Sequence, residues 1–259
     1  MDLSSLPRAS QLVPDSNAAS RWRPGLARRQ GRVLHSEIFA PSHEAGGVAC
    51  ALALALDDLR NSGDDRLEER PLLWVQDEAS RRKTGRPYRP GLPPELRHRV
   101  IHVAAKGAAD ALFALEEGMR CRDLACVIGE IHGNPRELGL TASRRLSLAA
   151  EKHGIPLFLV RHDAKRDLGS ARMRWEVRSA PSPRGCWNPA APGLPSWHAE
   201  LFRARMHPPS EWILRDDRKA LVGERVAERI LAPADQPPEH SPDHGDLVHV
   251  AGAGSLAAG

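Results

Sequence analysis

The chain has 259 residues and a mass of 28.4 kDa; 41% of its residues are hydrophobic and 27% are charged. This balance is typical of a folded globular protein and excludes a wholly disordered chain. The formal net charge of +4 is concentrated near the N-terminus: residues 1–35 contain six arginines and two acids, and the remainder contains 31 basic and 31 acidic residues. The body is therefore electrically neutral, which argues against strong non-specific binding to nucleic acid.

The apolar runs and the cysteines indicate the cellular compartment in which the protein is expected. The longest apolar run covers nine residues, 48–56, whereas a membrane span needs about 20. The first residues are interrupted by Pro7, Arg8 and Pro14 and lack the apolar core of a secretion signal. The four cysteines show no paired zinc-ligand spacing. We therefore expect a cytoplasmic protein with reduced thiols, no membrane contact and no metal.

Composition divides the chain into three parts. Residues 1–32 are rich in Pro, Ser and Arg and predict a basic, flexible arm. Residues 33–231 carry the periodic apolar pattern of a folded domain. Residues 232–259 contain Pro, His, Gly and Ala with little to bury, and predict a disordered tail.

The first part of the domain alternates between strand-like and helix-like segments. Thr141 is the expected N-cap of the third helix, and Gly154 its stop. Because the strands are apolar on both faces, the pattern predicts an α/β fold with a mainly parallel sheet covered by helices on both sides. The predicted strands are 33–40, 72–76, 99–104, 124–128 and 155–160, and the predicted helices are 46–61, 108–120 and 142–153.

After Gly169 the pattern changes to strict alternation of apolar and polar residues. Three short strands, each containing one tryptophan (Trp175, Trp197 or Trp212), predict antiparallel strands at the C-terminal edge of the sheet. They also predict an exposed edge to which a partner could add a strand. The apolar residues of segment 219–231 predict a closing helix.

The order of these elements and the amino-acid sequences of four segments resemble those of a known family. The order of a RecA-like core is a strand, a loop, a long helix, a strand that ends at an acidic residue, a further alternating run and then antiparallel strands. The chain resembles the ImuA family, the RecA-like (or SulA-like) proteins of bacterial damage-inducible mutagenesis cassettes. The segments that carry the resemblance are PLLWVQDEASRRKTGRPYRPGL, DALFALEEGMRCRDLACVIGEI, LTASRRLSLAAEKHGIPLFLVR and SARMRWEVRSAPS.

The resemblance implies a role rather than a reaction. It implies a non-catalytic adaptor of SOS-induced, error-prone translesion DNA synthesis. The implied partners are ImuB, which is a catalytically inactive relative of Y-family polymerases, and an error-prone C-family DNA polymerase, with RecA as a further candidate. DNA would then be contacted indirectly.

The place of a phosphate-binding loop lies between the first strand and the first helix. Such a loop needs a Lys for the phosphates and a Ser or Thr for Mg²⁺. Gly46 and Gly47 stand at those two positions, and Glu44 would repel a phosphate. The sequence therefore predicts a degenerate nucleotide site with no cofactor and no ATPase activity. The residues of this loop are Ala40, Pro41, Ser42, His43, Glu44, Ala45, Gly46 and Gly47.

Two acids follow apolar strands at positions where RecA-like enzymes keep functional carboxylates. Glu78 stands where a water-activating Glu is expected, and Glu130 stands at the Walker B place. We interpret each as a remnant or as a surface acid at a strand end. His240, His244 and His249 crowd the tail with three acids, but their spacing matches no metal site.

Basic residues are the candidates for contacts with DNA or a partner. The arm interleaves arginines with one tryptophan, a second basic cluster follows Glu78, and two arginines begin the predicted helix at 142–153, near its positive dipole end. For the arm, a solvated disordered segment is an equally good interpretation. The candidates are Arg21, Trp22, Arg23, Arg28, Arg29, Arg81, Arg82, Lys83, Arg86, Arg89, Arg144 and Arg145.

Two alternative functions remain open from the sequence. A SulA-like inhibitor of cell division would share the degenerate core and bind the polymerising GTPase FtsZ, although such inhibitors are shorter. A working RecA-type ATPase would need a cation in the phosphate loop, which the Gly46-Gly47 pair does not provide.

Overall fold

The computed structural model describes residues 34–60, 69–183, 188, 190–204, 207–217 and 221–226. The predicted arm and tail lie outside these residues. In the described part of the chain, no helix is both long enough and apolar enough to cross a membrane.

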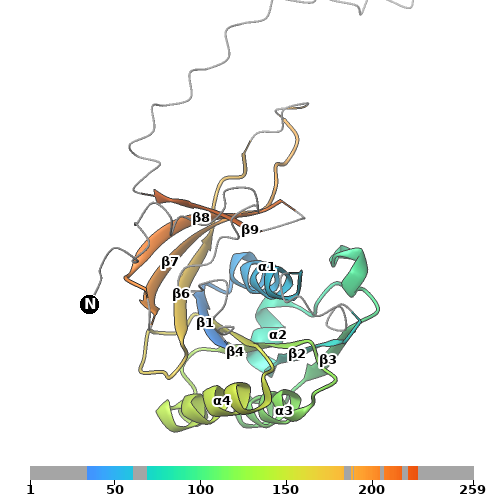
Figure 1. Cartoon of the computed structure of the whole chain (residues 1–259), viewed down its shortest axis with the longest axis vertical. Coiled ribbons are helices and arrows are strands. Elements are labelled where there is room, and N and C mark those ends of the chain that lie inside the picture. The colour runs from blue at the N-terminus through green and yellow to red at the C-terminus, as the bar shows by residue number, and fades with distance from the viewer. Residues whose placement is uncertain are drawn as a thin grey trace, which may run out of the picture.

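The described chain forms one nine-stranded sheet with helices on both faces (Figure 1). The strand order is β3-β2-β4-β5-β1-β6-β7-β8-β9, in which all pairs from β3 to β6 are parallel and the later pairs are antiparallel. The strands are β1 (His35–Ala40), β2 (Leu72–Gln76), β3 (Val100–Ala104), β4 (Cys126–His132), β5 (Leu157–His162), β6 (Met173–Ser179), β7 (Ser196–Ala204), β8 (Ser210–Asp216) and β9 (Leu221–Arg225). The mixed α/β class and the antiparallel C-terminal edge are confirmed.

Three of the four helices in the described residues follow the predicted segments closely. They are α1 (Gly46–Arg60), α2 (Glu78–Thr84), α3 (Ala108–Arg120) and α4 (Leu140–His153), with short 3₁₀ turns at Arg89–Gly91, Pro94–Leu96 and Arg136–Leu138. Gly154 ends α4 with φ 72°, as expected for a glycine stop. The N-cap of α4 is Gly139 rather than Thr141, because the helix begins one residue before Thr141. Helix α2 was not predicted, since it is too short to show an apolar stripe.

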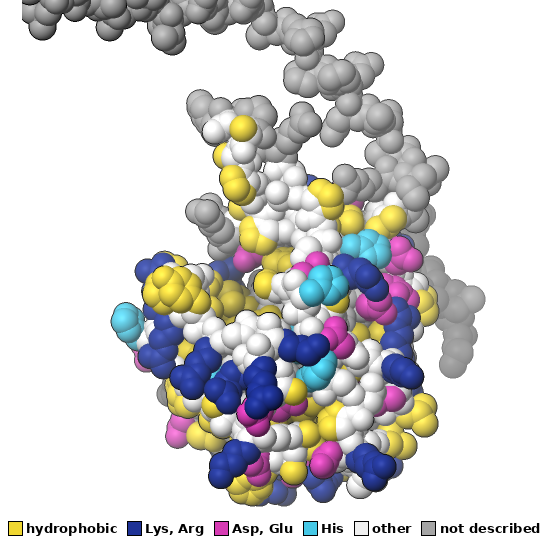
Figure 2. All heavy atoms as spheres, turned by 180° about the vertical axis from the view of Figure 1, so that it is seen from behind, with side chains coloured by type: hydrophobic (Ala, Val, Ile, Leu, Met, Phe, Trp, Pro, Cys, Tyr) yellow, Lys and Arg dark blue, Asp and Glu magenta, His cyan; other side chains and the backbone are white. Residues whose placement is uncertain are grey.

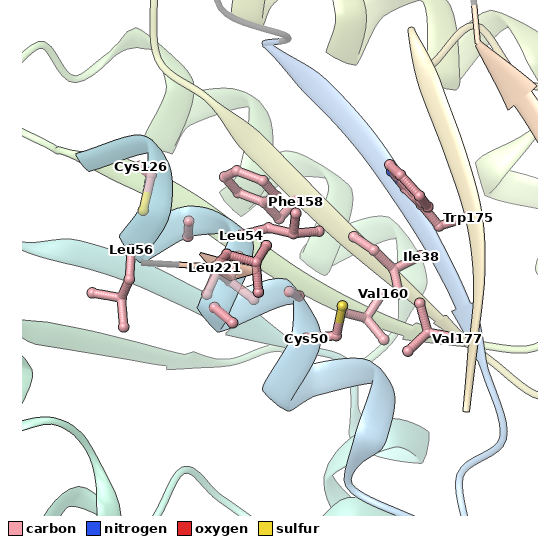
Figure 3. Packing of buried hydrophobic residues seen from close by; sticks show 14 of the residues in the cluster. Ile38, Cys50, Leu54, Leu56, Cys126, Phe158, Val160, Trp175, Val177 and Leu221 are labelled. Atoms are coloured by element: carbon pink, nitrogen blue, oxygen red, sulfur yellow. The ribbon is translucent and has the colours of Figure 1, made fainter. Parts of the chain in front are cut away.

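Two apolar layers lie on the two faces of the sheet. On one face, α1 packs on Ile38, Phe158 and Val160 and on strand β6. Leu221 of β9 joins this cluster (Figure 3). On the other face, α3 and α4 cover the alternate residues of β2, β4 and β5. Figure 1 shows α1 between the parallel strands and the antiparallel extension, so the sheet curls around that helix.

The C-terminal edge of the sheet differs from the sequence-based prediction in two respects. Residues Leu221–Arg225 form strand β9 rather than the start of a helix, because they pair with β8. The tryptophan strands do not leave an exposed edge, since β6 and β7 lie inside the sheet and β9 covers β8. Trp175, Trp197 and Trp212 are all buried. Pairing of β9 with β8 places Leu221 in the core beside α1.

Candidate functional site

A cavity of about 380 Å³ opens at the carboxyl ends of the parallel strands. Ligands of open α/β sheets commonly bind at this edge. One wall is the first half of α1, with Val48, Ala49 and Leu52. The opposite wall is the end of α2 together with residues 85–88 and Leu92, which follow that helix. The floor consists of Trp74, Gln76 and Glu130. The β1–α1 loop, which is the place of the predicted phosphate loop, forms part of the mouth.

Glu130 is the centre of a buried polar network on the floor. Its side chain is 1% exposed. Oε1 accepts from Trp74 Nε1 at 2.6 Å and from Gln76 Nε2 at 3.0 Å. Oε2 accepts from Thr84 Oγ1 at 3.1 Å and lies 2.8 Å from His162 Nε2. Both oxygens are thus satisfied, which is what keeps a buried carboxylate tolerable.

Strand periodicity explains how these side chains meet. Trp74 and Gln76 are two residues apart on β2, and Gln76 is in register with Glu130 on the neighbouring strand β4. Alternate residues of a strand point to the same face. The four partners of Glu130 therefore come from β2, β5 and the end of α2, and the network lies on the face that α1 covers.

Gln76 extends the network toward β3. Its amide Nε2 also donates to the Gly85 carbonyl at 2.8 Å, and its Oε1 lies 2.8 Å from His102 Nε2. Because Oε1 accepts, His102 carries its proton on Nε2. Burial lowers the pKa of His102, and the nearby Arg86, Arg81 and Arg89 lower it further, against the opposing effect of Glu130. His102 is therefore neutral at physiological pH.

The predicted phosphate loop is closed by a carboxylate of the protein itself. Asp163, directly after β5, accepts from the backbone N–H of Ser42 at 2.9 Å and from its hydroxyl at 2.6 Å. Lys83 Nζ lies 3.3 Å from the same carboxylate. The Ser42 hydroxyl and N–H, followed by Lys83, hold the pKa of Asp163 well below its usual range. A free anion would have to displace this carboxylate from the Ser42 N–H.

Glu44 of this loop and the two glycines at the start of α1 also contact neighbouring strands. Glu44 Oε1 accepts from the Ser179 backbone N–H at 3.0 Å. A Cβ at Gly46 would lie 2.8 Å from Ser179 Oγ, and a Cβ at Gly47 would overlap the Cβ of Ala40. A side chain at Gly47 therefore has no room unless β1 moves, and a side chain at Gly46 would have to displace the Ser179 hydroxyl and would still contact the Ser179 backbone N–H closely.

Comparison of the sequence with models of known protein families and with curated proteins finds no match. The site is therefore interpreted from its own geometry.

The two acids singled out from the sequence have different surroundings. Glu78 lies on α2 and pairs with Arg82 at 2.8 Å, with 43% of its side chain exposed. It does not line the cavity. The interpretation of Glu130 as a surface acid is wrong, because Glu130 is buried in the network described above. The acid that directly ends β2 is Asp77, which caps α2 by accepting from the Ser80 N–H at 2.7 Å.

The structure separates the basic candidates into three groups. Arg81, Arg82 and Lys83 are in α2, and Arg86 and Arg89 are in the segment that follows it, beside the cavity. Arg144 and Arg145 are on α4, on the opposite face of the sheet, where Arg145 pairs with Glu116 of α3 at 2.6 Å. This pair offsets the unfavourable position of Arg145 near the helix N-terminus. Arg21, Trp22, Arg23, Arg28 and Arg29 lie outside the described residues, as do the tail histidines.

Sequence reasoning missed most of the network. Trp74 and Gln76 belong to a strand whose apolar character hid their polar atoms, and His102 and His162 stand in other strands. A glutamine at the end of a buried strand was the available signal, since buried polar side chains need partners. Among the described residues, no three His, Cys, Asp or Glu side chains gather to form a metal site.

Proposed function

We propose that the protein is a non-catalytic adaptor of an SOS-induced, error-prone translesion DNA synthesis complex. In this proposal it binds ImuB and supports the error-prone C-family polymerase, and its domain is a RecA-like core that no longer performs ATP chemistry. The four segments quoted above support the family part of this proposal. The order of elements, from β1 through the antiparallel strands, supports the RecA-like part.

The observation that carries the non-catalytic part is the bond between Asp163 and Ser42. A phosphate loop acts by offering backbone N–H groups and a lysine to a phosphate. Here the Ser42 N–H and hydroxyl are bound to an internal carboxylate, and Gly46 and Gly47 are packed against neighbouring strands. Glu44, which lines the cavity, and Asp163, which binds Ser42 of the cavity lining, add negative charge beside the cavity, and Lys83 offsets part of that charge.

Affinity capture from DNA-damaged cells tests the adaptor role. We expect the tagged full-length chain to retain ImuB and the C-family polymerase, with the same recovery in the presence and absence of ATP. A charge-reversal variant at an exposed site remote from the cavity, Glu117→Lys, serves as a control for non-specific capture. Recovery of FtsZ without ImuB would contradict the adaptor role and favour a division inhibitor.

Equilibrium dialysis with ATP and Mg²⁺ tests the non-catalytic role separately. We expect no saturable nucleotide binding by the purified chain. Saturable binding that requires Mg²⁺ would overturn this part of the proposal, whatever proteins are captured.

A further inference from the structure

The segment between α2 and β3 presents the most exposed aromatic ring of the described residues. Tyr88 is 73% exposed. Its ring edge lies against Gly91, at 3.1 Å from the position of a Cβ there, and the Gly91 N–H donates to the Tyr88 carbonyl at 3.0 Å. Pro87 and Pro90 flank it in the chain and restrict the backbone. The ring is held in place while most of its surface faces solvent.

Three arginines that lie near His102, namely Arg81, Arg86 and Arg89, have no carboxylate partner among the described residues. Arg81 and Arg86 form no ion pair there, in contrast to Arg82 with Glu78 and Lys83 with Asp163. Arg89 donates to the Val100 carbonyl at 3.2 Å. The Nε of Arg81 is buried without a hydrogen-bond partner. In Figure 2, Lys and Arg side chains form a band on the side of the molecule that carries α2 and the α2–β3 segment.

The cavity continues this surface inward. Arg86, Pro87 and Tyr88 belong to one wall, Val48 and Leu52 belong to the opposite apolar wall, and Trp74 lies on the floor. The polar atoms of the floor are already bound to one another, since Glu130 receives four donors. The cavity therefore offers flat apolar contact but few free groups that could distinguish one base from another.

We propose that this surface binds single-stranded nucleic acid, with a base stacked on Tyr88 and the adjoining phosphates on Arg81, Arg86 and Arg89. Aromatic rings beside unpaired cations are the general means of binding single strands without sequence preference. A neighbouring unstacked base can enter the cavity between Leu52 and Trp74. This inference goes beyond the proposed function, because an adaptor requires only protein contacts.

The geometry favours a single strand over two other anionic ligands. In a duplex, base faces are stacked on one another and are not available to a projecting ring. An acidic peptide would satisfy the arginines, but it carries no flat group in every residue to use the Tyr88 ring. The neutral body of the chain limits the affinity, so binding should be weak and sensitive to salt.

Fluorescence anisotropy with a labelled oligothymidylate of about 20 nucleotides, titrated with the full-length chain at low salt, tests this proposal. We expect Tyr88→Ala to weaken binding about tenfold and Tyr88→Phe to preserve it. Phe113→Ala is the matched control, because Phe113 is 68% exposed on α3, on the opposite face of the sheet. Each of Arg81→Ala and Arg86→Ala should make the log–log salt dependence less steep by about 0.7, and Arg144→Ala should leave it unchanged.

Differences between variants isolate this surface, because the arginines of residues 1–32 contribute equally to all of them. The proposal is overturned if Tyr88→Ala binds like the intact chain while remaining folded, or if Phe113→Ala weakens binding as much. Equal affinity for a duplex of the same sequence would also overturn it. Competition by polyglutamate as strong as that by unlabelled oligothymidylate would identify an acidic-peptide surface instead. Oligouridylate in place of oligothymidylate distinguishes RNA from DNA as the source of the strand.

Discussion

Asp163 and Ser42 are 121 positions apart in the chain and joined by two hydrogen bonds, one to the Ser42 N–H and one to its hydroxyl. Asp163 has φ 51°, a left-handed conformation that aspartate tolerates better than most residues. In this conformation the Asp163 carboxylate, which follows β5, lies against the β1–α1 loop. The loop is therefore bound to an anion that belongs to the protein.

Neutralising that carboxylate should open the loop to external anions. Asp163→Asn introduces a residue that also tolerates the left-handed backbone conformation, and it removes the negative charge. We expect inorganic phosphate to raise the melting temperature of this variant more than that of the unaltered chain, at matched ionic strength. Glu117→Gln, which removes an exposed charge on α3, should respond like the unaltered chain. An equal response of all three proteins would contradict the assignment.

Packing at the start of α1 should make Gly47 sensitive to the smallest substitution. A Cβ at this position would overlap that of Ala40, so Gly47→Ala should lower the free energy of unfolding by about 1–3 kcal/mol. At Gly107 no atom lies within 4 Å of the corresponding position, and Gly107→Ala should cost less than about 1 kcal/mol. Urea unfolding measures both. Equal losses would show that the contact with Ala40 is not tight.

The network on the cavity floor should make Glu130 important for stability. Glu130→Ala leaves the indole N–H of Trp74 and the other donors unsatisfied, and should lower the free energy of unfolding by about 3–5 kcal/mol. Glu130→Gln should cost less because one acceptor oxygen remains. The exposed Glu78→Ala, which breaks only a surface pair with Arg82, should cost at most about 1 kcal/mol. A Glu130→Ala variant as stable as Glu78→Ala would refute this assignment.

Buried His35 should make the protein less stable in mild acid. Its Nδ1 lies 2.8 Å from Ser147 Oγ, and burial, followed by the charge of Arg174, lowers its pKa to about 3. In the unfolded chain the imidazole gains a proton below pH 6.5, whereas in the folded chain it stays neutral until about pH 3. Stability is thus lost as pH falls through this window, by about 2 kcal/mol from this group between pH 7 and 5.

A non-titrating side chain at this position isolates the effect of His35. His35→Gln retains a hydrogen-bonding group for Ser147, so its free energy of unfolding should change less between pH 7 and 5 than that of the unaltered chain. Urea unfolding at the two pH values makes the comparison. Parallel pH profiles would mean that His35 is not the titrating group.

Local pattern was sufficient for the regular elements. Residues 72–76 and 108–120 form β2 and α3 with the predicted bounds, because continuous apolar runs and a helical stripe report directly on burial. Gly154 ended α4 for a local reason as well, since a glycine accepts the left-handed φ of 72°. The same reasoning failed for residues 221–225, whose apolar positions suit a helix stripe equally well. Pairing with β8 decided their conformation.

The sequence by itself determined the α/β class, the antiparallel C-terminal edge and the lack of side chains at Gly46 and Gly47, where α1 begins. Tertiary structure alone decided what occupies that loop and where Glu130 lies. The bonds of Asp163 to Ser42 and of Trp74 to Glu130 join residues 121 and 56 positions apart. Strand order brings these residues together, and no local periodicity encodes strand order. The sequence therefore shows only that a carboxylate follows a strand, and the partners of that carboxylate in the folded protein determine its chemistry.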